Sequence, residues 1–145
     1  MSLRLSTGTR NALLSTKSFL SIFVDSFIEI YTGLQPTSPD DAPTGTLLAR
    51  IYSDAASLGL EFSAAVSGVI GKKSAETWSG YGVATGTAGW FRLKAAGDTG
   101  VLSTTECRMD GACATSGGQL NMSSLNITLD ALQTISSFAI TQPDD

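Results

Sequence analysis

Few side chains in this sequence could carry out catalysis near neutral pH, because the chain contains no histidine. A serine nucleophile would then need a lysine as its base. None of Lys17, Lys72 and Lys73 has a serine three positions before it. The glycine-rich run at 80–86 resembles a loose phosphate loop, but it carries no lysine and no helix is expected after it. These patterns predict a protein that is not an enzyme and binds no cofactor.

Pairs of carboxylates could bind a metal ion or hydrolyse a glycosidic bond. The neighbours Asp40 and Asp41 lie in a proline-rich stretch that lacks the Asp-x-Asp-x-Asp-Gly pattern of a calcium site. We expect a solvated, turn-forming loop there and no metal site. Glu61 and Glu76 could serve a glycosidase only if the fold brings them face to face, which the sequence does not show. A glycosidase therefore stays the enzymatic alternative.

Cys107 and Cys113 flank Asp110-Gly111, a dipeptide typical of tight turns. We expect a bend at this dipeptide after a strand at 105–109, with Arg108 pairing with a carboxylate on a neighbouring strand. A hairpin there could bring the two cysteine Cα atoms within disulfide range, ~4.4 to 6.8 Å. Two unpaired thiols are the expectation and a disulfide is the alternative, because a cytoplasm keeps cysteines reduced. Two cysteines without histidine cannot complete a tetrahedral zinc site.

The composition fits one globular domain over residues 1–145, with 42% hydrophobic and only 15% charged residues. The net charge is -4 and the cations form no run longer than Lys72-Lys73, so we expect no direct binding of nucleic acid. The most apolar stretch, residues 19–30, is interrupted by polar residues and is shorter than the ~20 residues that span a bilayer. No secretion signal is recognisable, so we expect synthesis in a host cytoplasm and no membrane association.

Residues 1–25 are expected to form a helical segment. Four apolar residues recur at roughly helical spacing between residues 6 and 24, which predicts one amphipathic helix. They are Leu13, Leu14, Leu20 and Phe23. Thr7 or Thr9 could provide the N-cap oxygen, and the helix is expected to begin near Thr9.

Residues 26–141 are expected to form a β domain, and residues 142–145 a tail. The expected strands are rich in branched and aromatic residues or alternate apolar with polar side chains. They lie at 27–32, 46–53, 60–62, 69–70, 75–81, 89–94, 105–109, 119–122, 124–129 and 132–141. A loop with three prolines is expected at 35–43. Many short strands separated by turn residues predict a mainly β fold, an antiparallel β-sandwich or jelly roll with one N-terminal α-helix.

Short framework motifs follow one another along nearly the whole chain. They are residues 3–14 (LRLSTGTRNALL), 28–33 (IEIYTG), 35–36 (QP), 42–48 (APTGTLL), 78–80 (WSG), 84–92 (ATGTAGWFR), 110–111 (DG), 115–117 (TSG) and 120–121 (LN). In this order the motifs resemble small virion proteins encoded among the structural genes of tailed bacteriophages and prophages. The chain departs from that pattern in a shorter stretch between Ser53 and Leu60 and in its cysteines.

The resemblance implies a structural component of a phage particle, and the first expectation is a capsid decoration or cement protein on the head surface. Its partners would be the major capsid protein, further copies of the chain in a dimer or trimer, or both. The apolar face of the N-terminal helix is the expected docking interface; the alternative is that this face packs on the sheet. The face consists of Leu13, Leu14, Phe19, Leu20 and Phe23.

Two other functions remain open at this point. A tail or head-to-tail adaptor protein would assemble similar β domains into rings or tubes. A carbohydrate-binding module or fibre domain would instead stack sugar rings on Trp78, Tyr81 and Trp90. Aromatic residues on paired strands also supply the core of β proteins, which is the competing interpretation of these three residues.

Overall fold

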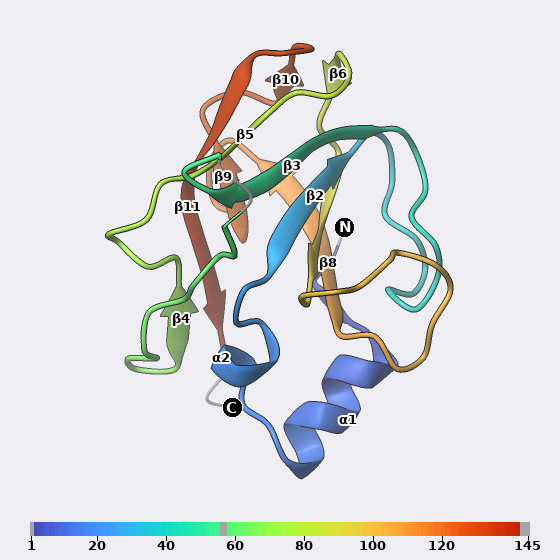
Figure 1. Ribbon diagram of the computed structural model, residues 1–145, viewed down its shortest axis with the longest axis vertical. Coiled ribbons are helices and arrows are strands. Elements are labelled where there is room, and N and C mark those ends of the chain that lie inside the picture. The colour runs from blue at the N-terminus through green and yellow to red at the C-terminus, as the bar shows by residue number, and fades with distance from the viewer. Residues whose placement is uncertain (1, 56–57, 143–145) are drawn as a thin grey trace.

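A computed structural model describes residues 2–55 and 58–142 of the chain. The fold is mainly β, and two short helices lie at one end of a barrel of strands, opposite the end that carries β6 and β10 (Figure 1). The mainly β class predicted from the sequence is therefore confirmed, whereas the helical segment differs from the prediction.

The first helix, α1, spans Thr7–Ser15. Its N-cap is Ser6, whose side chain accepts a hydrogen bond from the N–H of Thr9 at 3.2 Å. Ser6 has extended backbone dihedrals, as an N-cap residue usually does. The prediction of Thr7 or Thr9 as the cap was wrong, and the helix begins two residues earlier than expected.

The N-terminal segment contains two helices rather than one. α1 ends where the N–H groups of Thr16 and Lys17 both donate to the carbonyl of Ala12. Ser18 then starts a second helix, α2 (Phe19–Ile22), through a reciprocal capping box with the residue three positions on. The expected single helix was wrong because this local capping geometry favours a new start over continuation.

The eleven strands of the described residues are short except for the last. They are β1 Arg4–Leu5, β2 Phe27–Tyr31, β3 Leu47–Ser53, β4 Val69–Gly71, β5 Trp78–Tyr81, β6 Gly86–Thr87, β7 Trp90–Lys94, β8 Arg108–Ala114, β9 Leu120–Met122, β10 Asn126–Ile127 and β11 Leu132–Thr141. Most expected strands overlap one of these. The stretch at 60–62 contributes only isolated bridges, and β1 and β6 were not expected.

Seven of the strands close into a barrel. Strands β8, β7, β2, β3, β5 and β11 are hydrogen-bonded in that order, and β9 pairs with both β11 and β8. All of these pairs are antiparallel except β8 with β9. Outside the barrel, β1 pairs with β8, β4 pairs with β11, and β6 pairs with β10. Because β9 links both edges, the sheet is one closed barrel rather than an evident two-sheet sandwich.

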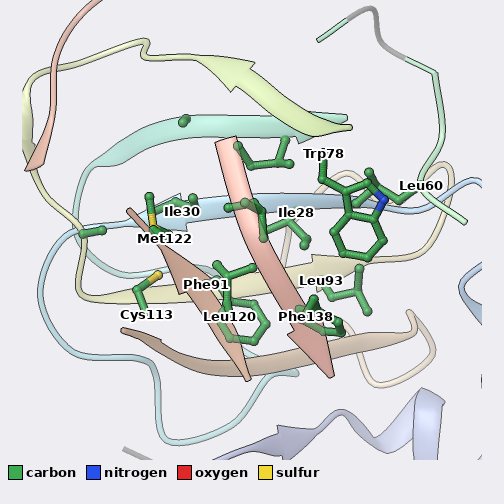
Figure 2. Packing of buried hydrophobic residues seen from close by; sticks show 14 of the residues in the cluster. Ile28, Ile30, Leu60, Trp78, Phe91, Leu93, Cys113, Leu120, Met122 and Phe138 are labelled. Atoms are coloured by element: carbon green, nitrogen blue, oxygen red, sulfur yellow. The ribbon is translucent and has the colours of Figure 1, made fainter. Parts of the chain in front are cut away.

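The barrel interior is the hydrophobic core (Figure 2). Ile28 and Ile30 of β2 lie opposite Leu93 and Phe91 of β7 in the antiparallel register. Phe138 of β11 closes this layer, with its ring centroid 5.8 Å from that of Phe91. Since alternate residues of a strand share one face, this register turns the apolar set inward and leaves a second set pointing outward.

Asp110-Gly111 lies within β8, so the turn predicted there was wrong. The strand expected at 105–109 is confirmed only at Arg108 and Met109, where β8 begins. Arg92 lies directly opposite Asp110 and donates to both carboxylate oxygens, at 2.7 and 2.8 Å. Gly111 lies opposite Phe91, where a Cβ atom would come within 2.8 Å of the ring. These two cross-strand partners, distant in sequence, outweigh the local turn preference of the dipeptide.

The outward face of β2, β7 and β8 is also buried, because the loops 32–46 and 95–107 are bound to it; we call it the covered face. Arg92 donates to the carbonyl of Asp41 in the first loop, and Arg108 donates to the carbonyl of Pro39. Arg108 also forms two hydrogen bonds with the carboxylate of Asp98 in the second loop, at 2.7 and 2.8 Å. The carboxylate partner of Arg108 thus lies in a loop and not on the neighbouring strand.

Candidate functional site

An apolar groove of about 410 Å³ opens at the helical end of the barrel. Its walls come from β1, β8, β11, β4 and both helices. The lining residues are Leu3, Leu5, Leu13, Phe19, Ala65, Gly68, Ile70, Met109, Ile140, Thr141 and Gln142. Grooves of this size bind ligands or partner side chains mainly by burying apolar surface.

The five residues predicted to form one docking face do not lie on one face. Leu13 and Phe19 line the groove, and Leu20 is 38% exposed. Leu14 is 87% exposed and lies on the solvent side of α1. Phe23 is fully buried in the core, with its ring 4.8 Å from that of Phe19, so it cannot contact a partner. The break between the two helices separates these residues.

Positive charge accompanies the exposed apolar side chains of α1. Residues 1–24 carry Arg4, Arg10 and Lys17 and no carboxylate, a net charge of +3. The rest of the chain carries six cations against thirteen carboxylates, a net charge of -7. Arg10 and Lys17 are exposed and form no ion pair in the described part of the chain. The groove and this exposed side of α1 together are called the docking surface below.

The N-terminal half of α1 is fixed firmly to the barrel. The Asp40 carboxylate accepts hydrogen bonds from the N–H and hydroxyl of Thr7, at 2.8 and 2.6 Å. Ser6 and Thr9 both accept from the N–H of Arg108. A carboxylate at a helix N-terminus is favourable because it meets unpaired N–H groups and the positive end of the dipole. The loop does form a turn at this point, as expected, but Asp40 is held against the helix rather than solvated.

Gly8 allows this close approach of α1. A Cβ atom on Gly8 would lie 2.3 Å from the carbonyl oxygen of Thr105. The first turn of the helix thus packs directly on the backbone of the loop before β8, while Leu13 and Leu14 in its last turn stay accessible. The close packing of this first turn fixes the position of the docking surface on the barrel.

Glu61 and Glu76, the pair considered for glycosidase chemistry, do come close together. One oxygen of Glu76 accepts from the N–H of Glu61 and from the indole N–H of Trp78, each at 2.9 Å. Glu61 itself pairs with Lys73 at 2.5 Å. These contacts connect the segment before β5 to the segment before β4, so the pair has a clear structural role.

The two thiols are both free and lie far apart along one extended strand. Cys107 immediately precedes β8 and Cys113 lies within it, so about 20 Å separates them at ~3.3 Å per residue. This spacing excludes the alternative of a disulfide within one chain. Burial raises the pKa of Cys113 to about 12 and also raises the pKa of Cys107. Both are therefore thiols rather than reactive thiolates near neutral pH.

The aromatic residues considered for sugar binding are mostly inaccessible. Trp78 and Trp90 are fully buried, and only Tyr81 is exposed. Trp90 stacks on Tyr31 beneath the loops of the covered face, with ring centroids 4.7 Å apart. Neither tryptophan can stack on a sugar ring in this fold.

In the two buried ion pairs of the covered face, the arginine opposes the effect of burial on the pKa of its carboxylate partner. Burial by itself raises the pKa of Asp98, but the hydrogen bonds from Arg108 and from the N–H of Gly100 outweigh burial and lower it. For Asp110, burial raises the pKa and the hydrogen bonds and charge of Arg92 oppose the rise.

Within residues 2–55 and 58–142, no three His, Cys, Asp or Glu side chains gather as metal ligands would. No helix in that part is long and apolar enough to cross a membrane.

Helical spacing indicated Leu13 and Leu14 of the docking surface, and Phe19 was named with them as part of the expected docking face. Leu5 of β1 and the preceding Leu3 were missed, although they alternate with polar neighbours, because a strand of two residues gives too short a signal. The charge asymmetry between residues 1–24 and the rest was readable in the sequence and would have indicated the same surface.

Comparisons of the chain with models of known families, with curated proteins and with solved structures find no match.

Proposed function

We propose that this chain is a non-enzymatic structural protein of a tailed-phage particle, a decoration or cement protein that docks on the major capsid protein at the head surface. The docking surface is the observation that carries the proposal. It combines exposed leucines of α1 with Arg10 and Lys17, two exposed cations that form no ion pair among the described residues, and the first turn of the helix is fixed to the barrel. Such a surface suits a lasting contact with another protein, because it buries apolar area and leaves charges for a partner.

The rest of the fold supports a structural role in the same proposal. The buried arginines are engaged with carboxylates and loop carbonyls, which hold the long loops on the barrel. The sequence resemblance to phage virion proteins agrees with this use of a rigid framework. The antiparallel sandwich or jelly roll expected from the sequence also remains part of the proposal. The barrel would be a variant of that architecture in which the two edges of the sheet are joined.

The experiment is to measure the copy number and position of the chain in purified phage particles. Heads and tails are separated, the chain is quantified by mass spectrometry, and the heads are imaged by cryo-electron microscopy. We expect on the order of hundreds of copies on heads, as icosahedral repetition of a decoration protein requires. A Leu14→Ser/Arg10→Glu double variant added to undecorated heads should bind less than the unaltered chain.

Other results would overturn the proposal. A handful of copies located on tails or at the neck would favour the tail or head-to-tail adaptor function. Absence from both heads and tails would overturn any role as a virion component. A variant with the matched change Leu102→Ser, in an exposed loop away from the groove, serves as the control.

A further inference from the structure

One border of the groove is the free edge of β1. The N–H of Ser6 donates to the carbonyl of Arg108 on β8 at 3.0 Å. Peptide groups of successive strand residues point to opposite sides. The peptide groups of Arg4 and Ser6 therefore face β8, and those of Leu3 and Leu5 face away from it, where both residues line the groove.

The opposite border is the edge of β11 beyond the end of β9. The N–H of Gln142 donates to Gly68, and the carbonyl of Phe138 accepts from Lys72, so even-numbered residues here face the β4 side. The N–H of Ala139 donates to Gln119, on the β9 side. By the same alternation, the peptide groups of Thr141 also point to the β9 side, past the first residue of that strand.

The groove thus separates two strand edges that face each other. β9 joins β8 to β11 over only three residues, and in the described part of the chain β1 does not pair with β11. Exposed strand edges with unpaired N–H and C=O groups accept an added strand. The floor between these edges is apolar, with Leu13, Phe19 and Met109 among its side chains.

Charge further defines what can occupy the groove. Arg10 lies within α1 and donates to the hydroxyl of Thr7 at 2.9 Å, and Lys17 follows the end of α1. Both cations belong to residues 1–24, the segment that provides β1, α1 and α2 to the groove and contains no carboxylate. Both are exposed and lack a carboxylate partner in the part of the chain that the structure describes. An extended segment places alternate side chains on opposite faces, so apolar residues can enter the groove while acidic residues meet the cations.

We infer that the groove receives an extended segment of the partner protein, with alternating apolar and acidic residues, which adds as a strand between β1 and β11. This inference rests on the proposed docking function and names the chemistry of the partner. Backbone hydrogen bonds to Leu5 and Thr141 would hold the segment, the apolar floor would bury its alternate side chains, and Arg10 and Lys17 would select acidic over basic sequences.

The test uses the full chain and two synthetic hexapeptides with blocked ends, Glu-Leu-Glu-Val-Glu-Leu and Lys-Leu-Lys-Val-Lys-Leu. Each is titrated at low salt into isotope-labelled protein, and amide chemical shifts and hydrogen exchange are followed by NMR. We expect the acidic peptide to bind about tenfold more tightly, as a few exposed ion pairs allow. The amides of Leu5 and Thr141 should become protected, and added salt should reduce the preference.

Variants separate the contributions of charge and groove. Arg10→Glu combined with Lys17→Glu should reverse the preference between the peptides, and Leu13→Ser should weaken both. Leu102→Ser is the matched control for an exposed leucine and should change neither affinity. Each variant's amide spectrum shows whether it is folded.

Three results would overturn the inference: no binding of either peptide up to its solubility limit, equal affinity for both, or protection confined to amides away from Leu5 and Thr141. Concentration-dependent self-association that competes with the peptide would assign the groove to a second copy of the chain and would also overturn it. These measurements use isolated protein. Their failure is therefore distinguishable from failure of the proposed function, which the copy number in particles decides.

Discussion

The covered face and the docking surface use charged residues in opposite ways. On the covered face, Arg92 and Arg108 are fully buried and each forms paired hydrogen bonds with one carboxylate. On the docking surface, Arg10 and Lys17 are exposed and have no carboxylate partner among the described residues. Charges of the first kind connect distant parts of one chain, whereas charges of the second kind remain available to another molecule.

Apolar side chains differ between the two regions in the same sense. Trp90 and Tyr31 stack beneath the loops of the covered face and are shielded from water. Leu14 is largely exposed on the docking surface. Mutations in the first region should therefore change folding stability, and mutations in the second should change association while leaving stability nearly intact.

The largest expected effect comes from breaking one buried pair. Asp110→Ala leaves the guanidinium of Arg92 buried without its carboxylate, so we expect the free energy of unfolding to fall by about 3–5 kcal/mol. Urea denaturation of the variant and the unaltered chain measures this. An Arg92→Met/Asp110→Leu double variant is the control and should recover most of the loss, because no charge is left unpaired. A loss below about 1 kcal/mol in the single variant would contradict the assignment.

A smaller loss is expected for Gly111→Ala. The new Cβ would meet the ring of Phe91 at 2.8 Å, so the ring or the strand must move, at a cost of about 1–3 kcal/mol. Chemical denaturation measures the change. Combining Gly111→Ala with Phe91→Leu tests the cause, since the two effects should be less than additive if the ring is the obstacle. Full additivity would point to a different origin.

Acidification should lower the free energy of unfolding because it protonates Asp98 of the covered face. Its pKa is lower in the folded protein than in the unfolded chain, so the pair with Arg108 stabilises fully above the unfolded value of about 3.9. This contribution is lost as the pH falls through the lower folded value. Unfolding free energies measured between neutral and strongly acidic pH should decline more steeply for the unaltered chain than for Asp98→Asn. Parallel curves would show that Asp98 does not cause the decline.

The smallest effect on stability is expected at the docking surface. Leu14→Ser should change the unfolding free energy by no more than about 0.5 kcal/mol, because the side chain is 87% exposed. The same variant should bind undecorated phage heads less tightly in a co-sedimentation assay. A large loss of stability with unchanged binding would reverse the comparison between the two regions.

Several strands could be predicted from the sequence because their signal is local. β2, β3, β7 and β11 have branched, aromatic or alternating side chains that fit a half-buried strand wherever it pairs. The turn at Asp110-Gly111 was predicted from an equally local signal and was wrong. What decides that position is the register against β7, which places Arg92 and Phe91 opposite the two residues.

The docking surface could be predicted only in part, for the same reason. Helical spacing indicated Leu13, which does line the groove, but it also included Phe23, which the break after α1 turns into the core. The groove needs β1 beside β8 and α1 anchored by Asp40, and these contacts join residues that are far apart in the chain. No spacing rule within one segment contains that information.

One can read from the sequence alone the mainly β class, the approximate order of most strands, the low charge and the lack of histidine. These properties follow from composition and short-range periodicity, which set which side chains favour the interior. Three other features became known from the folded arrangement: β9 closes the barrel, Arg92 and Arg108 are buried with carboxylates, and a groove stays open between β1 and β11. Those outcomes depend on which distant segments meet, and the free energy of each meeting depends on the whole packed arrangement.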